Sequence, residues 1–365
     1  MIEIVFNVWI QHDFIHTLII YRKTRMFKTI GGKLIDTGGY SCVFHPALQC
    51  KTDSKKIQGR TISKLMQKDY AEIEWHISER VRKISLWKHY FSVSERICEL
   101  NSIQTDKDIT TKCDLVRKHP IHNLRLLQMA YIGKSISSYS FPSTFNMMHF
   151  VIHILEAGAL LLVNNIIHFD IHDGNILINN HSVPKLIDFN LSFIVHEVTK
   201  SDIFHDYTSN IHLPQLTPDY MAILAILHNI PMDRIIYNGV HSKHLKCMMS
   251  VLGISQHKVI MDLTKITQSA NGDLMNWFNR CWTKIDSWAI AMYLIDMIRR
   301  YSFVQQIGSV FKTHPILKKV LSHLCAIDPN ERWDCMRALS ILHPNSIIIK
   351  RYGAEWLKDH PISSS

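Results

Sequence analysis

One short loop of this chain carries residue types that phosphoryl transfer requires. The segment HFDIHDGN (168–175) places Asp170 and Asn175 close together, and Asp188 follows shortly afterwards in the segment DFN (188–190). Transfer of a phosphoryl group from a nucleotide needs one carboxylate to accept a hydroxyl proton. It also needs an asparagine and a second carboxylate to hold Mg²⁺ against the phosphates. A single Asp-Phe pair usually begins a loop or caps a helix, so the joint spacing carries the interpretation.

The flanking sequence predicts how these residues are positioned. Residues 176–178 (ILI) and 185–187 (KLI) are apolar, strand-like runs, and the turn-rich segment 179–182 (NNHS) lies between them. We therefore expect a hairpin between Asn175 and Asp188.

A second candidate for phosphate binding lies near the start of the chain. Residues 30–44 predict a strand, a glycine turn and another strand, in which Gly38 and Gly39 let backbone amides approach phosphate oxygens. A plain hairpin turn explains the two glycines equally well. Asp36 would lie near the phosphates and weaken nucleotide binding.

A lysine that contacts the nucleotide is expected between residues 51 and 64. Lys64 lies within an alternating, half-buried strand pattern, whereas the other candidates lie in turn-like sequence (Lys51, Lys55 and Lys56). Lys64 is therefore preferred. Glu74 falls in the apolar stripe of the helix predicted over 68–85, and a carboxylate there is costly unless it is paired, so we expect it to meet Lys64. The alternative is an exposed glutamate on an imperfect stripe.

The remainder of the chain predicts a strand over 124–131 that runs into a linker, an apolar helix over 143–163 and a largely helical second half. Two further segments attract attention, DSWAI (286–290) in an apolar helix and DPNERW (328–333) near the end.

Composition limits the classes of protein. The chain has 365 residues, 47% of them hydrophobic, which is enough for a large core. The formal net charge of +10 favours acidic partners. The sequence has no block of arginine and lysine interleaved with aromatic residues, so nucleic-acid binding is not expected. Eight scattered cysteines without C-x-x-C spacing predict neither a zinc site nor disulfides, and thus reduced intracellular thiols. Residues 1–21 hold too many polar residues to cross a bilayer and do not resemble a signal peptide.

Together these motifs resemble a whole protein-kinase domain from Ile30 to about Leu342. The phrase TGGYSCVF (37–44), the His-Phe-Asp loop and a long insertion are most similar to the divergent serine/threonine kinases of large nucleocytoplasmic DNA viruses. The resemblance implies an α+β, bilobal fold with a small β-rich lobe and a large helical lobe. The implied domains are an N-terminal extension (1–29), an N-lobe (30–130), a C-lobe (131–345) with a helical insertion at about 221–283, and a C-terminal tail (346–365).

The resemblance also implies functions for single residues. Asp170 would be the catalytic base, Asn175 and Asp188 the magnesium ligands, Lys64 the phosphate anchor and Glu74 its partner. Asp286 would accept backbone hydrogen bonds from the catalytic loop, and Arg332 would pair with Asp219. The implied ATP site comprises seven residues: Ile35, Gly38, Gly39, Val43, Lys64, Gln128 and Ala130.

The expected activity is ATP- and Mg²⁺-dependent phosphorylation of serine or threonine in protein substrates, within the host cytoplasm or the virion and without a membrane. Three departures stand out: the altered glycine loop, His172 where such kinases carry lysine, and Asn190 in place of glycine. Phe169 replaces the arginine that usually meets a phosphorylated segment, so activity without phosphorylation of Thr199, Ser201, Tyr207 or Thr208 is expected. The alternatives are a small-molecule phosphotransferase of the aminoglycoside or choline kinase type, and a pseudokinase that serves as a binding module.

Overall fold

The computed structural model describes residues 32–38, 40–53, 60–101, 112–204 and 213–361. The chain divides into two units, Met1–Ile30 and Gly31–Ser365, and the account below concerns the second. The predicted N-terminal extension (1–29) lies outside the described residues.

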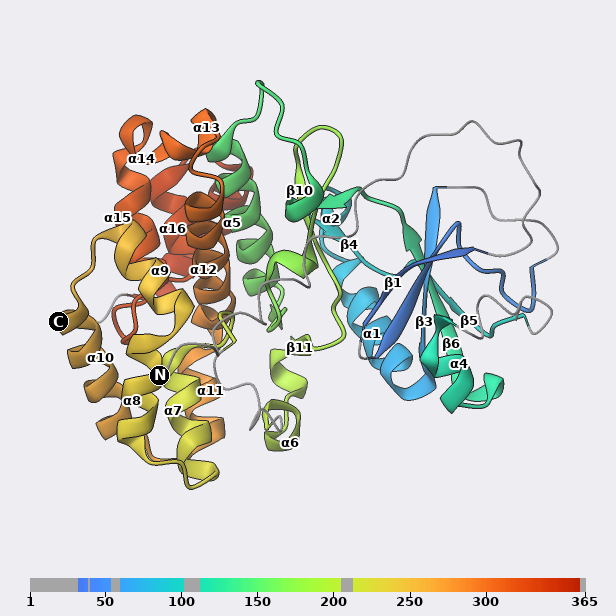
Figure 1. Cartoon of the computed structure of the whole chain (residues 1–365), viewed down its shortest axis with the longest axis horizontal. Helices are drawn as coiled ribbons and strands as arrows, with labels where there is room; N and C mark the ends of the chain where they lie inside the picture. Colours follow the sequence, from blue (N-terminus) through green and yellow to red (C-terminus); the bar gives the residue numbers. More distant parts are fainter. Residues whose placement is uncertain (1–31, 39, 54–59, 102–111, 205–212, 362–365) are drawn as a thin grey trace, which may run out of the picture. The chain divides into compact units, whose positions relative to one another are not determined.

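The first part of the described chain is a five-stranded antiparallel sheet in the order β1-β2-β3-β6-β5 (Figure 1). Its strands are β1 (Lys33–Thr37), β2 (Ser41–His45), β3 (Thr61–Gln67), β6 (Leu124–Ala130) and β5 (Arg96–Cys98). Together with the helical remainder, this sheet confirms the predicted α+β class.

The two faces of this sheet have different environments. Because side chains alternate along a strand, Lys64 and its cross-strand neighbours Val43 and Leu127 share one face. Helix α1 (Lys68–Val81) packs on that face through Ala71 and Trp75. The opposite face carries a separate hydrophobic cluster that includes Phe44, Leu65 and Leu126.

Two disulfides contradict the prediction of reduced thiols. Cys42 of β2 is bonded to Cys113, and Cys50 is bonded to Cys98 of β5. The bonded residues are 71 and 48 positions apart, so only the folded sheet brings them together. In the chain-entropy model, loops of these lengths stabilise the fold by about 4 kcal/mol each. The prediction holds for the other four cysteines, which are buried and free: Cys247, Cys281, Cys325 and Cys335.

The predicted hairpin is formed by β9 (Ile176–Ile178) and β10 (Pro184–Ile187). It belongs to a second sheet in the order β4-β10-β9-β7, with β4 (Phe91–Ser92) and β7 (Lys134–Ser135) at the edges. A short pair, β8 (Ile166–Ile167) with β11 (Phe193–Ile194), flanks the loop that leads into the hairpin.

The second half is helical, as the sequence predicts. Helices α5 (Met147–Val163), α12 (Ile285–Arg300) and α16 (Cys335–Leu342) pack on one another around the main hydrophobic core (Figure 1). Both α5 and α12 are buried along most of their length, which explains their apolar sequences. Helix α15 (Pro315–Leu324) also packs against α12.

The segment predicted as a helical insertion contains more helices than the sequence indicates. The sequence predicts helices near α7 (Pro218–Leu227) and α9 (Lys243–Leu252), and a loop at 269–273. The structure adds α8 (Met232–His241), α10 (Gln256–Ser269) and α11 (Leu274–Cys281). Helix α8 packs against α7, α9 and α10, and α10 also packs against α7.

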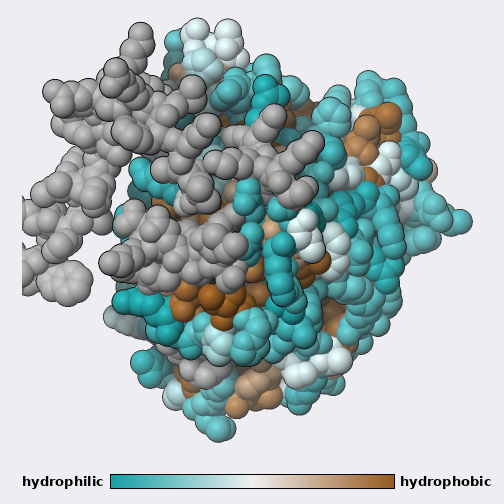
Figure 2. Space-filling view, turned by 90° about the vertical axis from the view of Figure 1, so that its right-hand side faces the viewer, coloured by the Kyte–Doolittle hydropathy of each residue, from teal (hydrophilic) through white to brown (hydrophobic). Residues whose placement is uncertain are grey.

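The surface is mainly polar on the face that Figure 2 presents, where hydrophobic side chains form small separated patches. Among the described helices, none has the length and apolar character needed to cross a membrane.

Candidate active site

Lys64 joins two segments that are far apart in the sequence. Its Nζ donates to Oε2 of Glu74 at 2.8 Å and to Oδ1 of Asp188 at 2.6 Å. The predicted contact between Lys64 and Glu74 is thus confirmed, and Asp188 is added to it. Lys64 and Glu74 are only 4% and 3% exposed, whereas the Asp188 side chain is 29% exposed. A ligand from solvent can therefore reach this cluster at Asp188.

The local fold explains why these side chains meet. Lys64 points to the α1 face of the sheet, and the buried side of α1 contains Glu74 between Ala71 and Ile77. Tyr70, four residues before Glu74 on the same helix, is exposed. Burial lowers the pKa of the Lys64 ammonium, but the two carboxylates outweigh this effect and raise it, so Lys64 stays charged.

Asp170 and Asn175 form the second group of the site. Nδ2 of the Asn175 side chain donates to Oδ2 and to the backbone oxygen of Asp170, at 2.9 Å each. Asn175 directly precedes β9 and Asp188 directly follows β10. Because Ile176 pairs with Leu186, the hairpin places both residues at its open end. The amide carbonyl of Asn175 and the Asp188 carboxylate thus remain as oxygen ligands from the same end of the hairpin.

Two further side chains contact Asp170. Gln215 donates from Nε2 to Oδ1 at 2.9 Å, and Nε2 of His172 lies 3.5 Å from Oδ2. Burial would raise the pKa of Asp170, but the hydrogen bond and charge of His172, together with Gln215, lower it below its usual value. Burial likewise opposes the charged form of His172, and Asp170 outweighs it, so the pKa of His172 is raised. Asp170 is therefore held as a carboxylate, and it favours the cationic form of the neighbouring imidazole.

The loop before Asp170 is held in an unusual backbone conformation. Asp286, at the start of α12, accepts hydrogen bonds from the backbone amides of His168 (2.7 Å) and Phe169 (2.9 Å). Phe169 has a φ of 65° and Asp188 a φ of 64°, in the left-handed region that non-glycine residues rarely adopt. His168 connects the two positions because its Nε2 donates to the backbone oxygen of Ile187 at 2.9 Å. Such conformations concentrate at functional sites, where surrounding contacts hold them.

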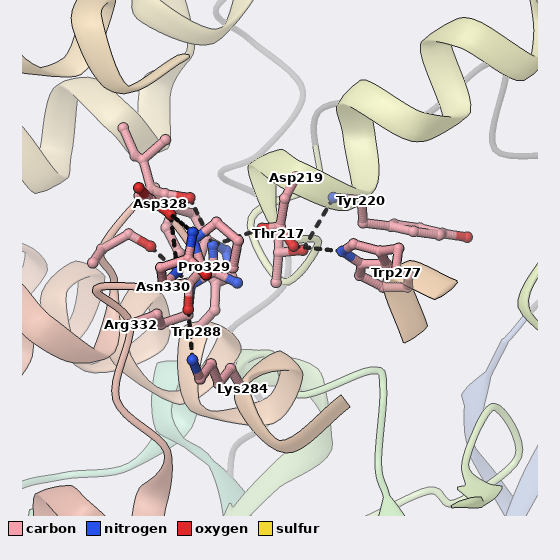
Figure 3. Close-up of polar contacts among 12 residues, drawn as sticks. Thr217, Asp219, Tyr220, Trp277, Lys284, Trp288, Asp328, Pro329, Asn330 and Arg332 are labelled. Carbon is pink, nitrogen blue, oxygen red and sulfur yellow. Dashed lines mark hydrogen bonds and ion pairs between the residues drawn. The ribbon is translucent and has the colours of Figure 1, made fainter. Parts of the chain in front are cut away.

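A buried ion pair supports the site from the helical region (Figure 3). Arg332 donates from Nη2 to Oδ1 of Asp219 at 2.6 Å, and Trp277 donates from Nε1 to Oδ2 at 2.5 Å. Arg332 also donates to two backbone oxygens, and its guanidinium lies over the ring of Trp288. Trp288 in turn donates to the backbone oxygen of Pro214, next to Gln215. The predicted Arg332–Asp219 contact is confirmed, and it supports the segment that contacts Asp170.

The residues predicted to line the nucleotide are placed only in part on the Lys64 face. Val43 lies directly beside Lys64, and Ile35 is exposed at a bulge in β1. The fold does not require a glycine at position 38, because the φ of Gly38 is not in the left-handed region and an added Cβ would make ordinary van der Waals contacts. Gly39 lies outside the described residues.

Gln128 and Ala130, at the end of the strand predicted to run into a linker, remain predicted backbone contacts to a nucleotide, and their side chains do not lie on the Lys64 face. Gln128 pairs with Ser63, one position from Lys64, so its side chain points to the opposite face of the sheet. There its Nε2 donates to the backbone oxygen of Leu48 at 2.8 Å, and its own backbone oxygen accepts from the amide of Glu95. Ala130 is two positions after Gln128 in β6, so its side chain points to the same face as that of Gln128.

Sequence reasoning missed Gln215 and Trp277. Neither lies in a recognisable motif, and each reaches its carboxylate only after distant segments pack together. A pairing rule could have found Trp277, because a carboxylate buried at Asp219 needs more than one donor.

The oxygen ligands present fit a magnesium nucleotide. Over the described ranges, no group of three or more His, Cys, Asp or Glu side chains forms a metal site. Mg²⁺ in nucleotide-dependent enzymes is usually held by one or two carboxylates together with substrate phosphates, so it needs no such group. Asn175 and Asp188 would supply the protein ligands.

Comparison with known proteins does not place the chain. No protein-family model matches it, and no curated protein matches it either.

Proposed function

We propose that this chain is an ATP- and magnesium-dependent serine/threonine protein kinase, and that its sheet and helical regions form a bilobal, kinase-like fold. One observation carries the proposal. Lys64 is bonded to both Glu74 and Asp188, which are separated by more than a hundred residues, at the hairpin end that also carries Asn175. A structural lysine would need only one carboxylate, whereas a second, solvent-accessible carboxylate leaves a place for a magnesium phosphate.

The residues of the chain divide the chemistry among them. Asp170 accepts the proton of the substrate hydroxyl while the hydroxyl oxygen forms a bond to the γ-phosphorus and the bond to the ADP oxygen breaks. Asn175 orients Asp170 through its amide nitrogen, and Lys64 holds phosphate oxygens. When bound by Asn175 and Asp188, Mg²⁺ offsets the negative charge that develops on the phosphates.

His172 occupies the position where the resemblance implies a lysine. Its raised pKa and its contact with Asp170 favour a cation beside the transferred group, so it can replace the ammonium in this function.

Three features of the site bear on the alternative functions. A pseudokinase would not need Lys64, Asp170, Asn175 and Asp188 together in this geometry. A small-molecule phosphotransferase could use the same loop, but Asp286 and the Arg332–Asp219 pair are the features that the resemblance links to protein kinases. We also retain viral origin and an intracellular location as predictions.

The experiment is incubation of the purified chain with γ-labelled ATP, Mg²⁺ and a panel of protein and small-molecule acceptors. We expect label on serine or threonine of proteins, and about 10²–10⁴-fold slower labelling with Asp170→Asn. Label on small molecules alone would replace the proposal with the second alternative.

A binding measurement accompanies the assay. Magnesium-dependent ATP stabilisation should be present in the parent chain and absent in Asp188→Ala, because a methyl group cannot replace a carboxylate ligand of a hard cation. Equal thermal shifts in both proteins would exclude Asp188 as a ligand.

A further inference from the structure

A pocket of about 280 Å³ lies beside the catalytic loop, on the side of Asp170 that faces the helical region. Its walls come from the catalytic loop, from the segment at Pro214 and Gln215, and from helices α9 and α12. Lys64, Glu74 and Asp188 are not among the lining residues, so the pocket is separate from the proposed nucleotide site.

Two residues that line the pocket also contact the proposed base, Asp170. His172 and Gln215 both line it, and both contact the carboxylate of Asp170. A group bound there would therefore belong to the molecule whose hydroxyl approaches Asp170.

Two polar atoms at the pocket have no hydrogen-bond partner among the described residues. Tyr293 of α12 is 5% exposed, and its hydroxyl has no hydrogen-bond partner among the described residues. Burying a hydroxyl without a partner is costly, so this group indicates a ligand. The Nε of Arg300 is also buried without a partner in the part of the chain that the structure describes.

Among the described residues that line the pocket, Lys243 is the cation that is left without an ion pair. Arg300 is bonded to Asp173 at 3.2 Å and to Asp296 at 2.6 Å, so both carboxylates that line the pocket already have a cation. Lys243, at the start of α9, also lines the pocket, is exposed and makes no ion pair with a described residue. A basic side chain entering the pocket would compete with Arg300 for Asp173 and Asp296, whereas an acidic one would meet Lys243, the Tyr293 hydroxyl and the Arg300 Nε as donors.

We propose that this pocket receives an aspartate or glutamate side chain of the protein substrate, close in sequence to the phosphorylated hydroxyl. The proposal rests on the proposed kinase function and gives it a substrate preference. Positively charged donors that converge on one carboxylate form the stronger class of hydrogen bonds, which makes such a preference measurable.

The test uses the full chain and a set of serine peptides in which each flanking position carries glutamate, glutamine or lysine. At one position near the serine, we expect about tenfold faster phosphorylation with glutamate than with glutamine, which corresponds to one charge-assisted contact. Lys243→Gln and Tyr293→Phe should each reduce that preference. Lys246→Gln is the matched control, because Lys246 is exposed on the same helix and does not line the pocket.

A direct binding measurement separates this inference from the kinase proposal. Fluorescence anisotropy compares the labelled glutamate peptide with its glutamine counterpart. Phosphorylation of the library without an acidic preference, or with a preference for lysine, would overturn the inference and keep the kinase function. Selective binding of the glutamate peptide that Tyr293→Phe abolishes, without any transfer, would keep the pocket and overturn the kinase function. Absence of both transfer and selective binding would overturn both.

Discussion

Two carboxylates in this molecule each receive a basic side chain at 2.6 Å, but their surroundings differ. The Asp219–Arg332 pair is closed, since both side chains are buried and Trp277 occupies the second carboxylate oxygen. The Asp188–Lys64 pair is open, since the Asp188 side chain is 29% exposed. The comparison shows that the chemistry of an ion pair does not reveal its function, whereas the accessibility of its carboxylate does. Substitutions at the site of the open Asp188–Lys64 pair should therefore mainly change activity. Substitutions at the closed Asp219–Arg332 pair should mainly change the stability of the fold.

The largest expected effect is that of Asp170→Asn, which changes the proposed base in the same site as the open Asp188–Lys64 pair. We expect turnover to fall by about 10²–10⁴-fold, the usual contribution of a positioned base, with an unchanged ATP affinity. The measurement is steady-state phosphorylation together with thermal unfolding. Turnover equal to that of the parent would exclude Asp170 as the base.

The closed group is tested by Arg332→Met. Removing the arginine leaves Asp219 buried with only the Trp277 hydrogen bond, and breaking a buried pair in this way costs about 3–5 kcal/mol. Urea unfolding should show this loss, and Arg280→Met, an exposed arginine on α11, should change stability by less than about 0.5 kcal/mol. If Arg332→Met retained the parent's stability and lost only activity, the distinction between open and closed pairs would fail.

Lys64→Met should reduce activity by about tenfold to a hundredfold, because charge-assisted hydrogen bonds are worth about 1.5–3 kcal/mol. Lys51→Met is the matched control, since Lys51 is exposed and pairs with Glu99 at the surface. The reverse order of activities would move the nucleotide-contacting lysine to Lys51.

His172 should give the activity a particular dependence on pH. Its pKa lies above the ordinary value of 6.5, so the imidazole is charged below that value and loses its proton as the pH rises through the raised pKa. Stability from its pairing with Asp170 is lost in the same direction. We expect kcat/KM to decline by a few-fold on the alkaline side, and His172→Lys to remove that decline. A decline that persists in His172→Lys would assign it to another group.

The smallest expected effect concerns phosphorylation of the segment after Asp188. Glu197 in that segment already pairs with Arg80 (3.0 Å) and His76 (2.9 Å) of α1, so a carboxylate occupies the contact that a phosphate would make. Thr199 and Ser201 are exposed, and Tyr207 and Thr208 lie outside the described residues. Phosphatase treatment should change the rate by less than about twofold, or roughly 0.5 kcal/mol. A tenfold loss that rephosphorylation restores would show that these acceptors matter.

The sequence predicts local features well and distant ones poorly. The hairpin, the strand that holds Lys64 and the buried position of Glu74 follow from periodicity within a few residues. The face to which the Gln128 side chain points could not be predicted, because a difference of one position reverses the face of a strand. The disulfides and Gln215 depend on segments that meet only in the folded chain, and no local pattern marks them.

The disulfides have a mechanical consequence for the first sheet. Both connect segments on or beside the sheet face opposite Lys64, and they join β2 to the residues before α4 (Asp114–Lys118) and the segment after β2 to β5. Strands linked in this way cannot slide past one another independently. If the site closes around a ligand, the sheet should therefore move as a rigid body together with Lys64. The backbone should bend only where the sheet connects to the helical region.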